Sequence, residues 1–175
     1  MITDVTTYYL EMTDPKDLRP SLCAYPALSI EQPPIPSPEL NKFLYTTVGE
    51  DWLWTDRLPW TGQEWQEWVN CPELKTWVAY ASGTPAGYFE LETHPDGSAE
   101  IASFGLLPSF IGRGLGGHLL TIAVQNAWQM GATRIWLHTC TLDHPNALRN
   151  YSDRGFRVFR ESTVPQDVPE DSSGP

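Results

Sequence analysis

The chain has 175 residues, of which 41% are hydrophobic and 19% charged, and its formal net charge at pH 7 is −11. This length and balance predict a single globular domain, and so acidic a chain disfavours nucleic acid or an anionic membrane as a partner. No apolar run reaches the roughly 18 residues of a membrane helix, and the N-terminus lacks a signal-peptide pattern, so we expect a cytoplasmic location. The three scattered cysteines, Cys23, Cys71 and Cys140, disfavour a disulfide framework or a zinc site.

The first half of the chain predicts one strand followed by helices. Residues 5–12 read as a strand, and Asp14-Pro15 begins a short helix. Six prolines between residues 20 and 38 predict a loop. Ser37 before Pro38 predicts a helix over about 38–48, and Thr61 with Glu64 forms a capping box that opens a second helix to about Asn70.

The second half predicts an antiparallel meander and then a strand–helix–strand unit. The expected strands are 76–81, 86–93 and 98–107, followed by a glycine-rich turn and a helix that ends at Met130. A strand over 134–141, a helix over 144–154 capped by Asp143 and a last strand over 156–161 complete the order. We therefore expect an α+β (mixed α/β) fold, with helices flanking a mostly antiparallel sheet that contains one parallel strand pair. Residues 164–175 are predicted to be a flexible tail.

The glycine-rich turn, residues 111–117, has the features of a phosphate-binding site. A helix N-terminus preceded by glycines presents free N–H groups, and Arg113 adds a positive charge. The alternative is a turn that only packs the helix on the sheet. Gly112, Gly114 and Gly117 also fit the dinucleotide fingerprint, but Leu137 stands near the position of the expected acidic residue. A nicotinamide-dependent oxidoreductase is therefore disfavoured.

Two motifs resemble those of the GNAT superfamily of acyl-CoA-dependent N-acyltransferases. The first comprises Ala99-Glu100-Ile101, Leu106-Leu107-Pro108 and Ile111-Gly112-Arg113-Gly114-Leu115-Gly116, and the second Asn146-Ala147 with Tyr151-Ser152-Asp153-Arg154-Gly155-Phe156. Ile111 stands where that family usually has Gln or Arg, and His144 where it often has Asn. The resemblance implies a single acyltransferase domain over 1–163, with a variable acceptor-side segment (1–75) and a CoA-binding core (76–161).

The resemblance also implies a substrate and its binding residues. The co-substrate would be acetyl-CoA, the acceptor a primary amine, and the transfer direct, with no metal; the alternative is a catalytically weak acyl-CoA-binding module. The CoA diphosphate would lie on the glycine turn and the pantetheine beside residues 104–108, in a wedge against strand 134–141. The implied CoA-binding residues are Leu106, Leu107, Ile111, Gly112, Arg113, Gly114, Leu115, Gly116, Gly117, Asn146 and Tyr151, with His144 an alternative to Asn146.

Amide formation requires one group that accepts the amine proton and one that protonates the departing thiolate. Tyr151 stands where the family's usual acid lies; the alternative is a ring that only packs on the sheet. Glu100 is the candidate base, since on a strand it shares a face with the apolar residues Ala102 and Phe104. The alternative for Glu100 is a surface carboxylate. The reserve bases are Glu90, Glu92 and His138.

The acceptor side is rich in tryptophan and in acid. Trp52, Trp54 or Trp60 would wall the acceptor pocket, and the neighbouring acids Glu50, Asp51 and Asp56 would then favour a cationic acceptor. The alternative is an acidic, solvated loop. Cys140 is interpreted as a buried thiol rather than a nucleophile. The oligomeric state is left open.

Overall fold

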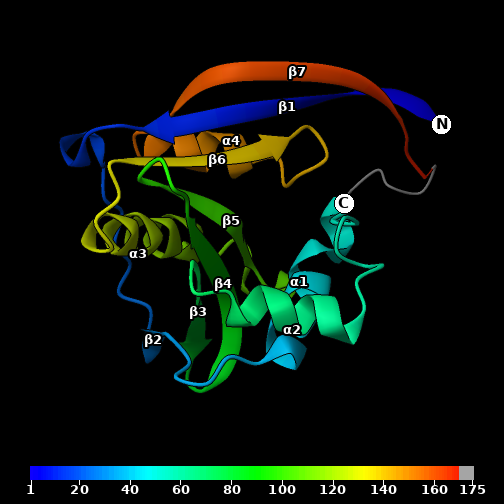
Figure 1. Cartoon of the computed structure of the whole chain (residues 1–175). Helices are drawn as coiled ribbons and strands as arrows, with labels where there is room; N and C mark the ends of the chain where they lie inside the picture. The colour runs from blue at the N-terminus through cyan, green and yellow to red at the C-terminus, as the bar shows by residue number, and fades with distance from the viewer. Residues whose placement is uncertain (170–175) are drawn as a thin grey trace.

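The computed structural model describes residues 1–169, which form a seven-stranded sheet in the order β2-β3-β4-β5-β6-β1-β7 (Figure 1). The strands are β1 (Ile2–Met12), β2 (Leu28–Glu31), β3 (Leu74–Ala81), β4 (Thr84–Thr93), β5 (Ser98–Leu106), β6 (Arg134–Cys140) and β7 (Arg157–Asp167). Every neighbouring pair is antiparallel except β5 and β6. The predicted mixed sheet with one parallel pair is confirmed.

Within the described residues, four α-helices cover the two faces of this sheet: α1 (Pro38–Gly49), α2 (Gly62–Asn70), α3 (Leu115–Gln129) and α4 (Ala147–Asp153). Trp77 and Phe89 pack in the core under α3, whereas Val78 and Tyr88 pack with residues of α1. Because alternate residues of a strand point to opposite faces, α1 and α3 lie on opposite sides of β3 and β4 (Figure 1).

Local capping explains where the first two long helices begin. The Ser37 side chain accepts a hydrogen bond from the Leu40 N–H at the start of α1. Thr61 and Glu64 exchange both hydrogen bonds of a capping box at the start of α2. Three short 3-10 turns, η1 (Pro15–Asp17), η2 (Glu50–Trp52) and η3 (Pro108–Phe110), complete the helical segments of the described chain. In residues 1–169, no helix is long and apolar enough to cross a membrane.

Three predicted boundaries are wrong. The proline-rich loop contains β2, which pairs with β3 at the sheet edge. Residues 164–167, expected in the tail, extend β7 because Val164 pairs with Val5 on β1. The last helix begins at Ala147 with Asn146 at its N-cap, so Asp143 is not its cap. The part of the predicted tail over 170–175 lies outside the described residues.

The parallel strands β5 and β6 form a wedge. They pair only from Ser98 to Glu100 against Arg134 to Trp136, and then diverge. Farther along β5, the register against β4 shifts so that Ala102 has no partner on β4. Such a bulge bends the strand and re-aims its side chains. The expected opening between these two strands is therefore present.

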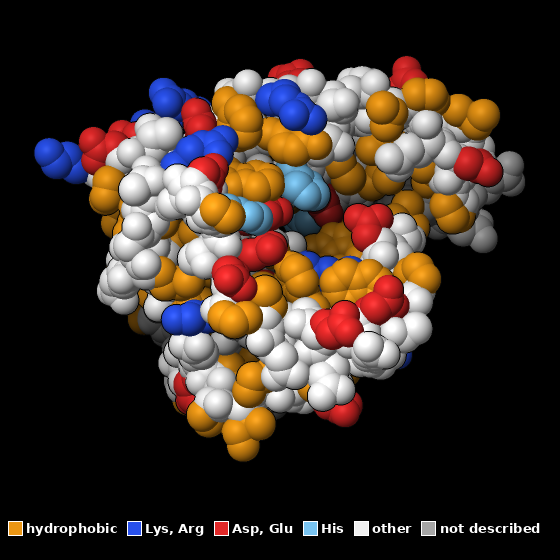
Figure 2. Space-filling model, in the orientation of Figure 1, with side chains coloured by type: hydrophobic (Ala, Val, Ile, Leu, Met, Phe, Trp, Pro, Cys, Tyr) orange, Lys and Arg blue, Asp and Glu red, His pale blue; other side chains and the backbone are white. Residues whose placement is uncertain are grey.

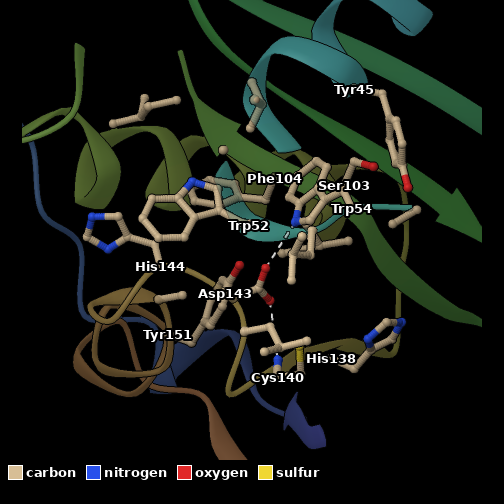
Figure 3. Close-up of a pocket in the computed structure, with 18 of the residues that line it drawn as sticks. Tyr45, Trp52, Trp54, Ser103, Phe104, His138, Cys140, Asp143, His144 and Tyr151 are labelled. Carbon is tan, nitrogen blue, oxygen red and sulfur yellow. Dashed lines mark hydrogen bonds between the residues drawn. The ribbon is translucent and has the colours of Figure 1, made fainter. Parts of the chain in front are cut away.

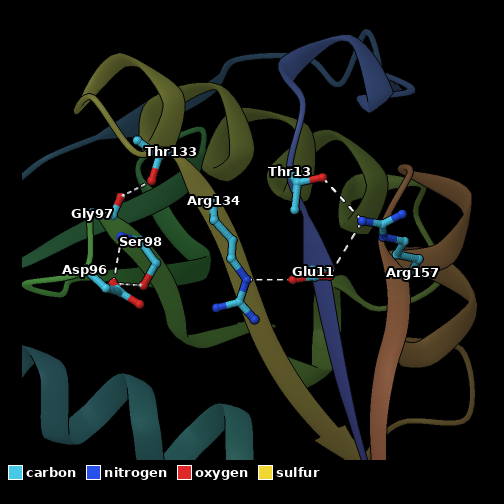
Figure 4. A network of polar contacts seen from close by, with 8 residues as sticks. All are labelled: Glu11, Thr13, Asp96, Gly97, Ser98, Thr133, Arg134 and Arg157. Carbon is cyan, nitrogen blue, oxygen red and sulfur yellow. Dashed lines mark hydrogen bonds and ion pairs between the residues drawn. The ribbon is translucent and has the colours of Figure 1, made fainter.

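Polar contacts hold the closed end of the wedge (Figure 4). The Thr133 N–H and hydroxyl both donate to the Gly97 carbonyl, at 2.9 and 3.2 Å. Arg134 on β6 binds the Glu11 carboxylate on β1 at 2.6 Å, which ties the strand to its other neighbour. With its narrow end fixed, the wedge opens toward the glycine turn and the loop before α4.

Candidate active site

A cavity of about 630 Å³ occupies the open end of the wedge. Its wall is built by β5, β6, the glycine turn, the loop after α1 and the loop before α4. Figure 2 shows a hollow near the middle of this face, with hydrophobic side chains inside and Asp, Glu and His side chains around it. The predicted site residues in its lining are Glu100, Leu106, Ile111, Gly112, Gly114, Leu115, Gly116, Asn146 and Tyr151.

At one end of the cavity lies the N-terminus of α3. Gly112 and Gly114 each have a φ of +79°, a conformation that favours glycine. Gly114 is the N-cap of α3, no side chain caps the helix, and its first turn contains no acidic residue. The free N–H groups and the positive end of the helix dipole therefore suit an anionic group such as a diphosphate.

Three residues of the predicted CoA set lie outside the lining. Leu107 packs in the core beside α1. Arg113 turns toward the Tyr25 hydroxyl, at 3.3 Å. Gly117 faces Arg154, and a Cβ there would collide with the Arg154 guanidinium. Of the glycine turn, residues 111, 112 and 114–116 line the cavity, whereas 113 and 117 do not.

Tyr151 on α4 brings its hydroxyl to the cavity (Figure 3). Its ring packs edge-on to Phe104 and Phe156, with centroids 6.0 and 6.3 Å away, and the residue is buried. No residue in the described range forms a hydrogen bond with the hydroxyl, so it is available to a ligand. Burial, with the Asp143 charge adding to it, raises the pKa of Tyr151, and the hydroxyl therefore stays a proton donor at neutral pH.

Asp143 joins two loops across the cavity (Figure 3). One carboxylate oxygen accepts from the Trp54 indole at 2.9 Å, and the other from the Thr139 hydroxyl at 2.6 Å and the Cys140 N–H at 3.2 Å. The loop after α1 is thereby fastened to the loop before α4. The sequence does not reveal this bridging role, because an aspartate just before a helix is also a common N-cap residue and Asp143 is therefore predicted to be a cap.

The tryptophans divide into two groups. Trp52 and Trp54 line the cavity as expected, and Trp52 lies edge-on to His144 with ring centroids 4.8 Å apart. Trp60 does not line the cavity; it packs against Trp65 and against Trp68, and Trp68 does line the cavity. This side of the cavity is therefore built by the segment around η2 and by Trp68 of α2, and not by Trp60.

In the loop before α4, the His144 side chain contacts the backbone of its own loop. The Asn146 N–H donates to the His144 Nδ1 at 3.0 Å, and both residues line the cavity. Cys140 is half-buried in the same wall, and burial raises the pKa of its thiol. A thiol that resists ionisation is a poor nucleophile, which supports its interpretation as a packing residue.

Glu100 lies in more polar surroundings than expected. Its carboxylate is 3.0 Å from the His94 Nε2, and Glu92 is its direct partner across β4 and β5. The bulge at Ala102 breaks the alternation on which the expected apolar face depended. Burial and the Glu100 charge together raise the pKa of Glu92. One oxygen or nitrogen atom from each of Glu92, His94 and Glu100 lies within 4.8 Å of the others, so the three side chains form one polar cluster.

The reserve base Glu90 has a structural environment. It is fully buried, and its carboxylate accepts hydrogen bonds from Arg57 at 2.8 Å, Asn41 at 2.9 Å and Trp68 at 3.1 Å. Glu90 is not part of the cavity lining. The other two reserve bases, Glu92 and His138, line the cavity, and the His138 ring centroid is 5.7 Å from that of Tyr9.

The charges that line the cavity are mainly negative. Among residues 1–169, its carboxylates are Asp56, Glu92, Glu100 and Asp143, whereas its only Lys or Arg side chain is Arg57. Arg57 is already paired with the buried Glu90 and lies over the rings of Tyr45, Trp60 and Trp68. This part of the site therefore suits a cation.

The fold and the pocket together define a class of protein in which a splayed strand pair lies beside the uncapped N-terminus of a helix. Residues 41–156 match the Acetyltransferase (GNAT) family. The chain belongs to the GNAT family, as the two motifs predicted.

Individual relatives agree with this assignment. The mycothiol acetyltransferase of Corynebacterium aurimucosum is 33% identical over 89 residues, which cover 49% of this chain and 29% of that protein. A GCN5-related N-acetyltransferase from Kribbella flavida has a TM-score of 0.65 at 22% identity, over 98% of this chain and 62% of its own. One from Sphaerobacter thermophilus has a TM-score of 0.69 at 20% identity, over 94% and 51%. The structural likenesses show the fold, and the chain spans less than two thirds of each of these proteins.

Proposed function

We propose that this chain transfers an acetyl group from acetyl-CoA directly to a primary amine. The observation that carries the proposal is that one cavity contains the uncapped N-terminus of α3, the open side of β5 and the buried Tyr151 hydroxyl. Membership of the GNAT family supports an acyl-CoA co-substrate. The three unpaired cysteines support a cytoplasmic location.

The cavity offers binding groups to two parts of acyl-CoA, the diphosphate and the pantetheine. The helix terminus offers N–H groups to the diphosphate, and the unpaired edge of β5 beyond Glu100 offers backbone groups to the pantetheine amides. When bound, acetyl-CoA supplies an activated thioester. The fit needs no metal.

Two side chains of the cavity are assigned to proton transfer. An alkylamine has a pKa near ~10, so only about one molecule in a thousand is neutral at pH 7 and a base must accept its proton. We assign this role to the Glu100 carboxylate, which lines the cavity. We assign the protonation of the departing sulfur to Tyr151, whose buried hydroxyl remains protonated.

The acceptor is proposed to carry positive charge. Trp52 and Trp54 offer ring faces, and the carboxylates of the lining offer Coulomb attraction. A cationic small molecule or an exposed amine of a peptide could contact both the tryptophan rings and the carboxylates. Specificity within that class is a property to be measured with an acceptor panel.

The proposal is tested by thiol release from acetyl-CoA with a panel of amines. Acetyl-CoA should also stabilise the folded chain, by about 2.7 kcal/mol at a hundredfold excess over Kd, and NAD or ATP should do less. An equal response to NAD would overturn the CoA assignment. A response to acetyl-CoA without thiol release on any amine would favour the alternative, an acyl-CoA-binding module.

A further inference from the structure

Glu100 connects the cavity to a histidine on its outer side. Glu100 lines the cavity, whereas His94, in the turn after β4, does not. The Glu100 carboxylate and the His94 Nε2 are 3.0 Å apart, and their side chains are 16% and 29% exposed. The order from inside to outside is therefore cavity, Glu100, His94, water.

The position of His94 is fixed by the turn that closes the wedge. The His94 N–H donates to the Ser98 carbonyl at 2.9 Å, and its carbonyl accepts from the Gly97 N–H at 3.0 Å. The imidazole lies beside the Trp136 ring of β6, with centroids 5.8 Å apart. A ring held by its backbone and by a neighbouring ring presents the same nitrogen to Glu100 in every catalytic cycle.

The charged groups around His94 are mostly acidic. Glu92 and Glu100 face it from β4 and β5, and Asp96 acts on it from its own turn. The Asp96 carboxylate already accepts two hydrogen bonds from Ser98. Two cations also act on this cluster, Arg134 of β6 on Asp96 and Arg57 on Glu92, but burial and the Glu100 charge outweigh Arg57 and keep the pKa of Glu92 raised. The His94 Nε2 lies 3.0 Å from the Glu100 carboxylate, within reach of a proton passed between the two groups.

We propose that His94 relays to water the proton that Glu100 removes from the acceptor amine; this inference rests on the proposed function. The acceptor ammonium gives one proton to the Glu100 carboxylate and becomes the neutral nucleophile. The resulting carboxyl group gives that proton to the His94 Nε2, which restores the carboxylate. The imidazolium releases one proton to water through Nδ1, and exchange with solvent returns the ring to its first tautomer. His94 acts through Glu100 and does not contact the acceptor.

The test compares His94→Ala, His94→Gln, Glu100→Gln and the variant that combines His94→Ala with Glu100→Gln, in the same thiol-release assay as the wild type. Glutamine keeps an N–H donor near Glu100 but cannot carry a proton, so it separates a relay from a structural hydrogen bond. We expect both His94 variants to lose about tenfold or more in kcat, with KM for acetyl-CoA unchanged. Added imidazole should restore His94→Ala, which leaves a space, and not Glu100→Gln. The combined variant should be no slower than Glu100→Gln.

Each contrary result has a separate meaning. Wild-type activity in His94→Gln, or additive losses in the combined variant, would overturn the relay and leave the proposed function in place. A wild type that releases no thiol with any amine would overturn the proposed function, and the relay with it. The thermal shift produced by acetyl-CoA serves as the folding control, since His94 lies outside the cavity and should not alter it.

Discussion

At the scale of a residue, the Tyr151 hydroxyl is the sharpest test of the chemistry. Phenylalanine keeps the ring contacts with Phe104 and Phe156, and no partner in the described chain loses a hydrogen bond. We therefore expect Tyr151→Phe to leave Tm and CoA affinity nearly unchanged. The kcat should fall by about 10²–10³, since the hydroxyl acts mainly on the transition state. Saturating kinetics and a melting curve measure both effects.

A Tyr151→Phe variant with wild-type kcat has two possible explanations, which a rapid-mixing experiment separates. A burst of free thiol in the first turnover would show that a later step limits the rate. Without a burst, Tyr151 would be a packing residue and its catalytic assignment would be withdrawn.

Glu92 gives a pH-dependent prediction at the same scale. Its pKa is raised by burial and by the Glu100 charge, so the folded state favours its protonated form. The favourable contribution is complete below the unfolded pKa, near ~4.3, and is lost as pH rises through the higher folded value. The stability of the wild type relative to Glu92→Gln should therefore decrease over that interval, by less than about 1 kcal/mol because Glu92 is partly exposed. Urea unfolding of both proteins at several pH values measures this difference in unfolding free energy. A difference that does not change with pH would contradict the raised pKa of Glu92.

At the scale of an element, the N-terminus of α3 is expected to determine CoA binding. Gly114 has a positive φ, and a Cβ there would meet open space. Gly114→Asp would add backbone strain of about 1–2 kcal/mol and a negative charge where the diphosphate is expected. We expect the thermal shift produced by acetyl-CoA to disappear.

Gly131, just beyond the other end of α3, provides a matched control. It too has a positive φ, and no atom lies near a Cβ built on it. Gly131→Asp should therefore destabilise the fold by a similar mechanism and keep the response to acetyl-CoA. If both variants lost the thermal shift with acetyl-CoA equally, backbone strain, and not the loss of the diphosphate site at the glycine turn, would explain the loss.

The elements that the sequence predicts well are those with local causes. The caps at Ser37 and Thr61 depend on residues three positions away and were found. β2 and the end of β7 were missed because their stability comes from remote partners, Ala81 with Leu28 and Val5 with Val164. Proline content and polarity, which describe the segment alone, predicted a loop and a tail instead.

The same distinction applies to the site. The glycine turn and Tyr151 belong to motifs of contiguous residues, and the structure brings both to one cavity. The roles of Asp143 and His94 depend on contacts with Trp54 and Glu100 that folding creates. A bulge shifts the face of β5, and strand alternation alone does not reveal it.

At the scale of the molecule, the charge distribution agrees with the arrangement of the site. Residues 1–110 contain 5 basic and 16 acidic residues, whereas residues 111–163 contain 6 basic and 3 acidic ones. The first segment contributes Asp56, Glu92 and Glu100 to the cavity, and the second contributes the glycine turn together with Asp143, whose carboxylate already accepts three hydrogen bonds. An anionic co-substrate and a cationic acceptor would thus each approach a region of opposite charge.

This arrangement predicts how salt affects the KM of acceptor amines that differ in charge. 1,5-Diaminopentane and pentylamine have the same chain length and differ in a second ammonium group. At low salt we expect the diamine to have a KM about fivefold lower, the equivalent of about 1 kcal/mol of Coulomb attraction. Raising the salt from about 0.01 to 1 M shortens the screening length from about 30 to 3 Å, so this advantage should shrink, because the dication loses more attraction than the singly charged pentylammonium. Steady-state kinetics at saturating acetyl-CoA measure it, and equal KM values for the two amines at low salt would show that the acidic lining does not select the acceptor.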